Sequence, residues 1–171
     1  LWRLFETNAN IKWYLNIKNE ENKISFIEDM LILSYLIVDK LGVIKNEEYI
    51  FQPGIWFDYP DFKYAGLNEI DKKKMSPSRV KFIGYDTSHF SMFPSMIYSL
   101  KNSYSKGSFF YEFYDKINLM LGNFFFNKIV VYKKGSVFTM NYMDGTNGLY
   151  RYESKNNDAY LPFETSGTIL F

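Results

Sequence analysis

The residues Lys23 to Leu41, KISFIEDMLILSYLIVDKL, carry the strongest helical pattern in the chain and decide its fold class. Apolar residues recur there at spacings of three or four, which aligns them along one face of an α-helix. That face comprises Ile24, Ile27, Leu31, Tyr35 and Val38, and it is widened by Met30, Leu33, Leu36, Ile37 and Leu41. So broad an apolar face predicts burial against more than one neighbour, and Gly42 predicts the end of the helix.

Three further segments extend the helical prediction on either side of this stretch. Apolar residues follow helical spacing over 2–18, over 88–100 or 88–104, and over 108–128. Pro94 falls inside the second segment, where its ring requires either a place in the first turn or a kink. Apolar runs at 129–132 and 137–142 fit either a short β-hairpin or a helix end followed by a loop.

The sequence therefore predicts a mainly α fold of helical hairpins or a helical array, with long aromatic loops and one short β-hairpin as an option. Residues 1–171 fit a single domain, or one piece of a longer chain. A helical array with its loops gathered at one end resembles, in architecture alone, part of the α/α toroid found in many polysaccharide lyases and glycosidases.

Residues 45–84 form the least regular segment, because prolines and glycines punctuate it. Aromatic residues are dense between them, and Trp56 and Tyr59 are among these. Loops longer than about 12–15 residues are uncommon unless they are functional. We therefore expect residues 51–66 to form an ordered loop that is packed by its own rings and supplies one wall of a groove.

Composition and charge exclude several classes of protein. The chain has no cysteine, which excludes a disulfide framework, a zinc–thiolate site and a cysteine nucleophile. The net charge is +1 and the basic residues are dispersed, so we expect no nucleic-acid partner. Phosphate-loop and dinucleotide motifs are absent, and the single histidine excludes a multi-histidine metal site, so neither cofactor nor metal is expected. No apolar run reaches the roughly 18 residues of a membrane span.

Asp86 and His89 form the first candidate site, at a predicted helix start. A helix start favours a neutral imidazole, and His89 is the chain's only histidine, so it is the one candidate for a histidine base. The alternative is structural. In that case Asp86 is an N-cap and His89 is a first-turn residue bonded to it or to water.

Residues 142–151 form the second candidate site. The glycines of Asp144-Gly-Thr-Asn-Gly predict tight, exposed turns that would point Asp144 and Asn147 outward. Arg151 follows closely, and its planar guanidinium suits the binding of a carboxylate. Tyr142 and Tyr150 flank these turns. The alternative is a pair of ordinary hairpin turns with no further role.

The leading hypothesis is a carbohydrate-active domain, either a glycoside hydrolase or a polysaccharide lyase, with acid–base chemistry in an aromatic cleft. The catalytic candidates are Asp86, His89, Asp144 and Glu164, and the substrate-binding candidates are Trp56, Tyr59, Tyr142, Asn147, Tyr150 and Arg151. His89 or Tyr142 would be the base, because each can accept a proton. Asp144 or Glu164 would be the acid, and Arg151 would hold a sugar carboxylate.

Two alternatives come from other classes of function. One is a protein-binding module, such as an inhibitor or an immunity-type partner, because Tyr and Trp dominate binding hot spots. The other is a structural domain of a larger assembly, with the apolar tail 168–171 packed on further sequence. The compartment stays open, with export to the periplasm or the cell surface favoured over the cytoplasm.

Overall fold

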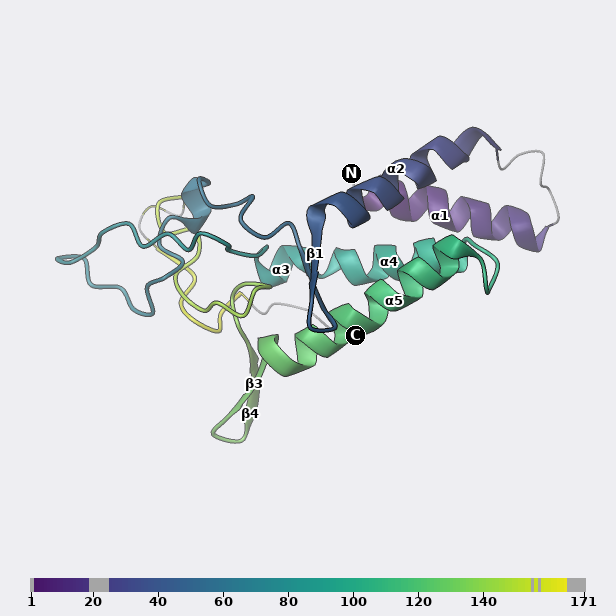
Figure 1. The fold of residues 1–171 in the computed structure, drawn as a ribbon. Coiled ribbons are helices and arrows are strands. Elements are labelled where there is room, and N and C mark those ends of the chain that lie inside the picture. Colours follow the sequence, from purple (N-terminus) through teal and green to yellow (C-terminus); the bar gives the residue numbers. More distant parts are fainter. Residues whose placement is uncertain (1, 19–24, 155, 157, 166–171) are drawn as a thin grey trace. The chain divides into compact units, whose positions relative to one another are not determined.

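The computed structural model describes residues 2–18, 25–154, 156 and 158–165 (Figure 1). Helix is the main element, at 45% of residues, and two small antiparallel sheets contribute the strands. Among the described residues, no helix combines the length and the apolarity that crossing a membrane would require. The predicted packing of the tail 168–171 lies outside the described residues.

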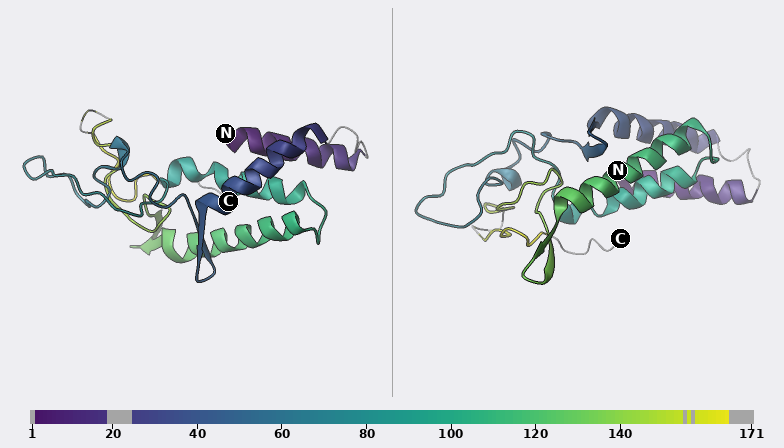
Figure 2. Two further views of the ribbon diagram at one scale, coloured as in Figure 1. Left: turned by 45° about the horizontal axis from the view of Figure 1, so that its top comes forward. Right: turned by 60° about the horizontal axis from the view of Figure 1, so that its bottom comes forward.

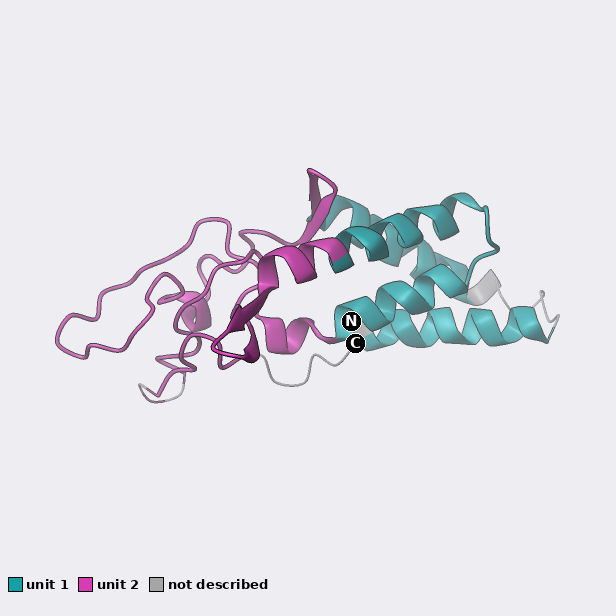
Figure 3. Cartoon of the chain, turned by 90° about the horizontal axis from the view of Figure 1, so that it is seen from below, with its two compact units in different colours: residues 1–42, 92–122 teal, residues 43–91, 123–171 magenta. Residues whose placement is uncertain are grey.

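Two compact units make up the chain, and each draws on two separate segments (Figure 3). Unit 1 comprises Leu1–Gly42 and Met92–Gly122, and unit 2 comprises Val43–Ser91 and Asn123–Phe171. Unit 1 is helical, whereas unit 2 holds the hairpins and the long loops. A single domain over residues 1–171 stays a prediction.

Unit 1 contains the helices α1 (Trp2–Ile17), α2 (Ser25–Leu41) and α4 (Met92–Asn102), together with most of α5 (Phe109–Phe124). α1 packs against both α2 and α4 (Figure 2). The buried apolar side chains of these helices include Phe5, Ala9, Leu31, Ile97, Leu100 and Ile117. The helices predicted around 2–18, 23–41 and 108–128 are therefore confirmed.

The apolar face of α2 is narrower than predicted. Ile27, Leu31 and Val38 are buried, with Ser34 in the same stripe. The hydroxyl of Ser34 donates to the carbonyl of Leu31 and lies 3.2 Å from the hydroxyl of Tyr114, so the buried serine has polar partners. Among the residues expected to widen the face, Leu33 and Leu36 are exposed, which makes the broad face wrong at these positions.

The helix predicted from Ser88 onward is divided into two, α3 (Thr87–Phe90) and α4, with Ser91 between them. Pro94 lies in the first turn of α4, where its missing N–H costs no intrahelical hydrogen bond. This matches the first of the two predicted places for the proline. The division leaves α3 as a short, capped turn that carries His89.

The strands β3 (Val130–Lys133) and β4 (Ser136–Thr139) form an antiparallel hairpin, the first of the two structures that the sequence allows for these runs. They follow a π-helical turn, Phe125–Ile129, that continues α5. Lys134 and Gly135 join them with φ angles of 50° and 76°. Two positive φ angles in a two-residue loop are typical of a type I′ turn, which favours glycine, asparagine or aspartate.

A second hairpin, β1 (Gly42–Lys45) and β2 (Glu48–Phe51), was not predicted. Its loop residues Asn46 and Glu47 have φ angles of 50° and 61°, so this turn has the same geometry. The sequence does not signal it, because Asn-Glu lacks the glycine that usually marks such turns.

Aromatic rings pack the long loop of unit 2, and the prediction for residues 51–66 is confirmed. The ring of Trp56 stacks on Phe62 at 5.6 Å and meets Tyr59 edge-on at 5.0 Å. A 3-10 helix, Pro60–Phe62, places Phe62 at the centre of a buried cluster. The other members of that cluster are Ala65, Ile83, Tyr142 and Tyr150.

Candidate functional site

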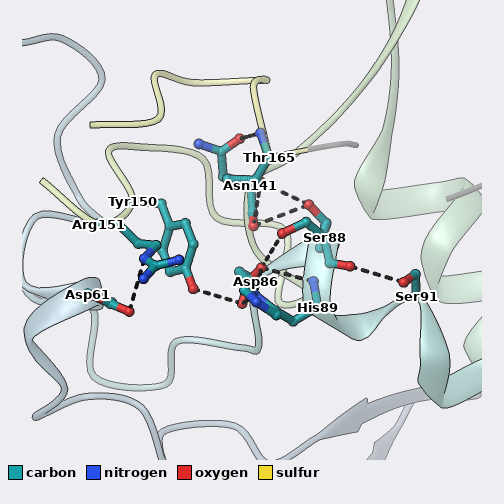
Figure 4. Close-up of polar contacts among 10 residues, drawn as sticks. Asp61, Asp86, Ser88, His89, Ser91, Asn141, Tyr150, Arg151 and Thr165 are labelled. Atoms are coloured by element: carbon teal, nitrogen blue, oxygen red, sulfur yellow. Dashed lines mark hydrogen bonds and ion pairs between the residues drawn. The ribbon is translucent and has the colours of Figure 1, made fainter. Parts of the chain in front are cut away.

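Asp86 caps α3 and holds a buried carboxylate that accepts hydrogen bonds from four groups (Figure 4). Only 1% of the residue is exposed. Its Oδ1 accepts from the hydroxyl of Ser88 at 2.6 Å and from the backbone N–H of His89 at 3.0 Å. Its Oδ2 accepts from the hydroxyl of Tyr150 at 3.1 Å. Such bonds offset the cost of burying a carboxylate.

The fourth donor to this carboxylate is the imidazole of His89, whose Nδ1 lies 2.8 Å from Oδ1 and 2.9 Å from Oδ2 of Asp86. An ionised carboxylate can only accept hydrogen bonds, so Nδ1 carries the proton. A neutral His89 is therefore held in the tautomer with its lone pair on Nε2. The side chain is 52% exposed. Asp86 thus orients a half-exposed imidazole.

Backbone pairing holds the start of α3 against residues 141–143. Asp86 and Tyr142 form an antiparallel bridge, and the N–H of Thr87 donates to the carbonyl of Asn141 at 2.9 Å. The side chain of Asn141 is fully buried and donates to the carbonyls of Gly148 and Leu161. Asn141 therefore links the start of α3 to Gly148 and Leu161, and Figure 4 shows its further hydrogen bonds with Thr165.

Tyr150 and Arg151 belong to a separate segment that also contacts the carboxylates of the site. Tyr150 forms an antiparallel bridge with Tyr160, and Arg151 then has a φ angle of 61°, which turns the backbone. The N–H of Arg151 donates to the carbonyl of Asp61 at 2.9 Å. The Nε of Arg151 lies 3.4 Å from Oδ2 of Asp61, which is an ion-pair distance without a hydrogen bond. Two consecutive residues thus face two different carboxylates.

These side chains line one pocket of about 250 Å³ in unit 2. Its lining residues are Trp56, Tyr59, Asp61, Phe62, Tyr85, Asp86, His89, Tyr150 and Arg151. Five of the nine are aromatic, so the walls offer ring faces beside a few polar groups. The Nε1 of Trp56 is a buried donor with no hydrogen-bond partner among the described residues. Apolar walls with a few convergent polar groups are typical of small-molecule sites.

The pocket brings together six of the ten predicted site residues. They are Trp56, Tyr59, Asp86, His89, Tyr150 and Arg151. The structural alternative for Asp86 and His89 also holds, because Asp86 is an N-cap and the imidazole of His89 is hydrogen-bonded to it. The N-cap geometry and the orientation of the imidazole therefore have the same cause.

The other four predicted residues lie outside this lining and have local partners. The hydroxyl of Tyr142 is buried and donates to the carbonyl of Leu149 at 2.7 Å. Asp144 accepts from the N–H and the hydroxyl of Thr146 within its own turn. Glu164 is exposed and accepts from the N–H of Leu161 at 2.6 Å. These contacts agree with ordinary turn roles.

Asn147 lies in a second, more open pocket of about 780 Å³. Its Oδ1 accepts from the backbone N–H groups of Asn141 and Phe163. The pocket is lined mainly by residues 68–70 and 161–163, with Lys133 placed 5.3 Å from the ring of Phe163. Asn147 therefore fixes the backbone around this second pocket.

Sequence reasoning missed three lining residues, which are Asp61, Phe62 and Tyr85. Asp61 and Phe62 belong to the aromatic loop that was expected to wall a groove, so their segment was predicted although their roles were not. Tyr85 directly precedes the predicted cap. No local pattern indicates that Asp61 would meet Arg151, because that contact depends on the tertiary fold.

Burial raises the pKa of Tyr142 and of Tyr150 above the ordinary tyrosine value, and the nearby charge of Asp86 adds to this. In the unfolded chain these phenols would ionise near pH 10. The folded state therefore keeps its protons where the unfolded state loses them. The contribution of these two phenols to stability is therefore fully present well below pH 10 and is lost as the pH rises through that value.

We therefore expect the urea midpoint of unfolding to drop between about pH 9 and pH 11. The Tyr150→Phe variant should lose less stability over that interval, since it has one buried phenol fewer. Tyr132→Phe is the matched control, because Tyr132 is 78% exposed. Equal alkaline losses in the wild type and in Tyr150→Phe would contradict the assignment.

Among the described residues, no group of three His, Cys, Asp or Glu side chains is placed to hold a metal ion. Comparison of the chain with protein-family models, with curated proteins and with solved structures finds no match. The pocket of unit 2 therefore has to be interpreted from its own chemistry.

Proposed function

We propose that this chain is a carbohydrate-active domain whose pocket in unit 2 performs acid–base chemistry on a saccharide. The observation that carries the proposal is the pair His89–Asp86, in which the carboxylate holds the proton on Nδ1 and leaves the lone pair on Nε2 of a half-exposed imidazole that lines the aromatic pocket. A positioned imidazole is the commonest general base in enzymes. The carboxylate behind it keeps the ring in the reactive tautomer.

The walls of the pocket support a saccharide as the ligand. The aromatic rings of Trp56, Tyr59 and Tyr85 offer flat apolar surfaces on which the apolar face of a pyranose can stack. A volume of about 250 Å³ is just below the range of about 300–1,000 Å³ for larger ligands, so it suits one sugar ring.

Two proton-transfer groups are available in this pocket. His89 Nε2 can accept a proton, and the partly buried phenol of Tyr85, whose pKa is raised by burial, carries a proton that can pass to a leaving oxygen. Their rings lie edge-on with centroids 6.3 Å apart. Asp144 and Glu164 lie outside this lining, so the proposed acid is Tyr85. This pocket lies within unit 2 and does not depend on an α/α-toroid architecture.

A second candidate function is the binding of a protein partner. Tyr132 and Val137 are paired across the β3–β4 hairpin, and they are 78% and 63% exposed. Exposed apolar pairs of this kind occur at contact surfaces. This function would use the hairpin and would not require the pocket.

Saturation-transfer NMR with a panel of methyl glycosides tests the proposed function. We expect sugar signals to be saturated by the wild type. Tyr59→Ala should weaken binding by about 2- to 10-fold, the value of one aromatic contact. Phe82→Ala is the matched control, since Phe82 is 67% exposed and outside the pocket lining. Absence of transfer to every sugar, or equal loss in both variants, would refute saccharide binding at this site.

A further inference from the structure

We infer that the substrate is an acidic sugar whose ring carboxylate replaces Asp61 on the guanidinium of Arg151, and that the glycosidic bond is cleaved by β-elimination. The inference rests on the proposed function and specifies its substrate class. The observations that carry it are the incomplete pairing of Arg151, the partners of Asp61 and the absence of a free carboxylate pair among the lining residues.

The guanidinium of Arg151 makes few polar contacts with the described part of the protein. Its only ionic contact among the described residues is the single Nε contact to Asp61 at 3.4 Å, which is too poorly placed for a hydrogen bond. Its two terminal nitrogens have no hydrogen-bond partner in the described part of the chain. An arginine at a carboxylate site normally makes two parallel hydrogen bonds. The guanidinium is therefore available for a bidentate ligand.

The backbone holds Arg151 at the pocket independently of its side chain. Its N–H donates to the carbonyl of Asp61, and the preceding Tyr150 is fixed by its bond to Asp86. The positive φ of Arg151 is uncommon for a residue other than glycine. The side chain can therefore change partners while its Cα stays in place.

Asp61 can release the guanidinium at little cost. Its carboxylate also accepts a hydrogen bond from the hydroxyl of Ser154, so it keeps a partner when Arg151 leaves. Its side chain is 30% exposed and that of Arg151 is 37% exposed, so water screens their attraction. Asp61 thus acts as an internal competitor for the same site as the substrate carboxylate.

The available groups fit elimination better than hydrolysis. Hydrolysis of a glycoside ordinarily uses two carboxyl groups. Asp61 and Asp86 supply the only carboxyl groups among the lining residues, and the carboxylate of Asp86 already accepts hydrogen bonds from four donors. A histidine base with an arginine suits removal of a proton next to a carboxylate, because the arginine stabilises the charge that develops there.

The elimination step balances with the groups at hand. His89 Nε2 takes the proton from C5 of the uronate, and the electrons of that C–H bond form a double bond between C4 and C5. The C4–O bond breaks, and the leaving oxygen takes the phenolic proton of Tyr85. The proton on His89 then returns to the tyrosinate through solvent. No oxidant, reductant or water molecule is consumed.

Binding of matched sugar pairs tests the substrate class. The probes are the methyl glycosides of galacturonate and glucuronate, with those of galactose and glucose as neutral partners. We expect the wild type to prefer the uronates. Arg151→Gln should reduce that preference about 10-fold or more, because a charged hydrogen-bond pair is lost. Asp61→Asn should increase uronate affinity about 2- to 5-fold, because the competitor is removed.

Incubation with oligogalacturonide and with oligoglucuronide tests the reaction. Elimination creates a C4–C5 double bond conjugated to the carboxylate, which is seen by its ultraviolet absorbance. New reducing ends without that absorbance would show hydrolysis and would overturn the elimination. Equal binding of acidic and neutral sugars, unaffected by Arg151→Gln, would overturn the acidic substrate but leave saccharide binding intact. Failure of both sugar classes to bind would overturn the proposed function itself.

Discussion

Replacing His89 with glutamine should lower the rate of saccharide cleavage by about 10²–10⁴-fold, the usual contribution of a positioned general base. Glutamine keeps a polar group of similar reach, and the backbone N–H of residue 89 still donates to Asp86. The fold should therefore be retained, which circular dichroism and a urea midpoint can check. Saccharide binding should change little, because the proposed stacking surface of Tyr59 is unaltered in this variant.

Lys81→Gln is a matched control for this variant, because Lys81 is exposed in the same unit and outside the pocket lining. Its rate should equal that of the wild type. Asp144→Asn and Glu164→Gln complete the set. Loss of activity in either of these two variants, with activity retained in His89→Gln, would show that the acid and the base lie outside this pocket.

The role of Asp86 in orienting the imidazole can be followed directly, because the chain has a single histidine. A long-range ¹H–¹⁵N spectrum should show neutral His89 protonated at Nδ1. In Asp86→Asn the carboxylate is gone, so the spectrum should show a mixture of tautomers and the rate should fall. An unchanged tautomer in that variant would show that Asp86 does not position the ring.

Replacing Gly148 with alanine should destabilise the protein by about 3 kcal/mol. A Cβ at this position would lie 1.9 Å from the carbonyl oxygen of Ala65 and 2.8 Å from that of Leu67. Both contacts are with backbone, so no side chain can rotate away to relieve them. The adjacent N–H of Leu149 donates to the same carbonyl of Leu67 at 2.8 Å, so the two segments cannot separate without losing this bond.

Gly122→Ala is the matched control for this substitution. Gly122 lies in α5, and a Cβ there would meet nothing within 4 Å. The Gly122→Ala substitution should stabilise the helix by roughly 0.5–1 kcal/mol, because glycine is more flexible than alanine in the unfolded chain. Urea unfolding of both variants measures the contrast. A midpoint for Gly148→Ala at or above that of the wild type would disprove the close approach.

Contacts between residues close in the sequence could be predicted, whereas contacts between distant segments could not. Asp86 and His89 were paired correctly because a cap and the third residue after it always meet at a helix start. The contact between Tyr150 and Asp86 spans 64 residues and left no local pattern. Asp144 illustrates the opposite error, because an acidic residue beside a glycine is equally suited to closing its own turn.

The helices predicted over 2–18, 23–41 and 108–128 were confirmed for a similar reason. Periodicity reports which residues share a face, and α2 follows it. Periodicity does not report how many neighbours a face has, so the exposure of Leu33 and Leu36 could not be foreseen. The β1–β2 hairpin escaped prediction because its turn geometry is adopted by Asn46 and Glu47 rather than by a marked dipeptide.

Each unit consists of two segments that are separated in the sequence. During synthesis, neither unit can therefore fold completely until its second segment has been made. The first helices of unit 1 must wait for residues 92–122, and Asp86 and His89 must wait for residues 150 and 151. The entropy of closing these long loops is lost before any of the contacts form, which slows folding. Polypeptides cut between Gly122 and Tyr150 should therefore lack the complete pocket of unit 2, although they contain Asp86 and His89.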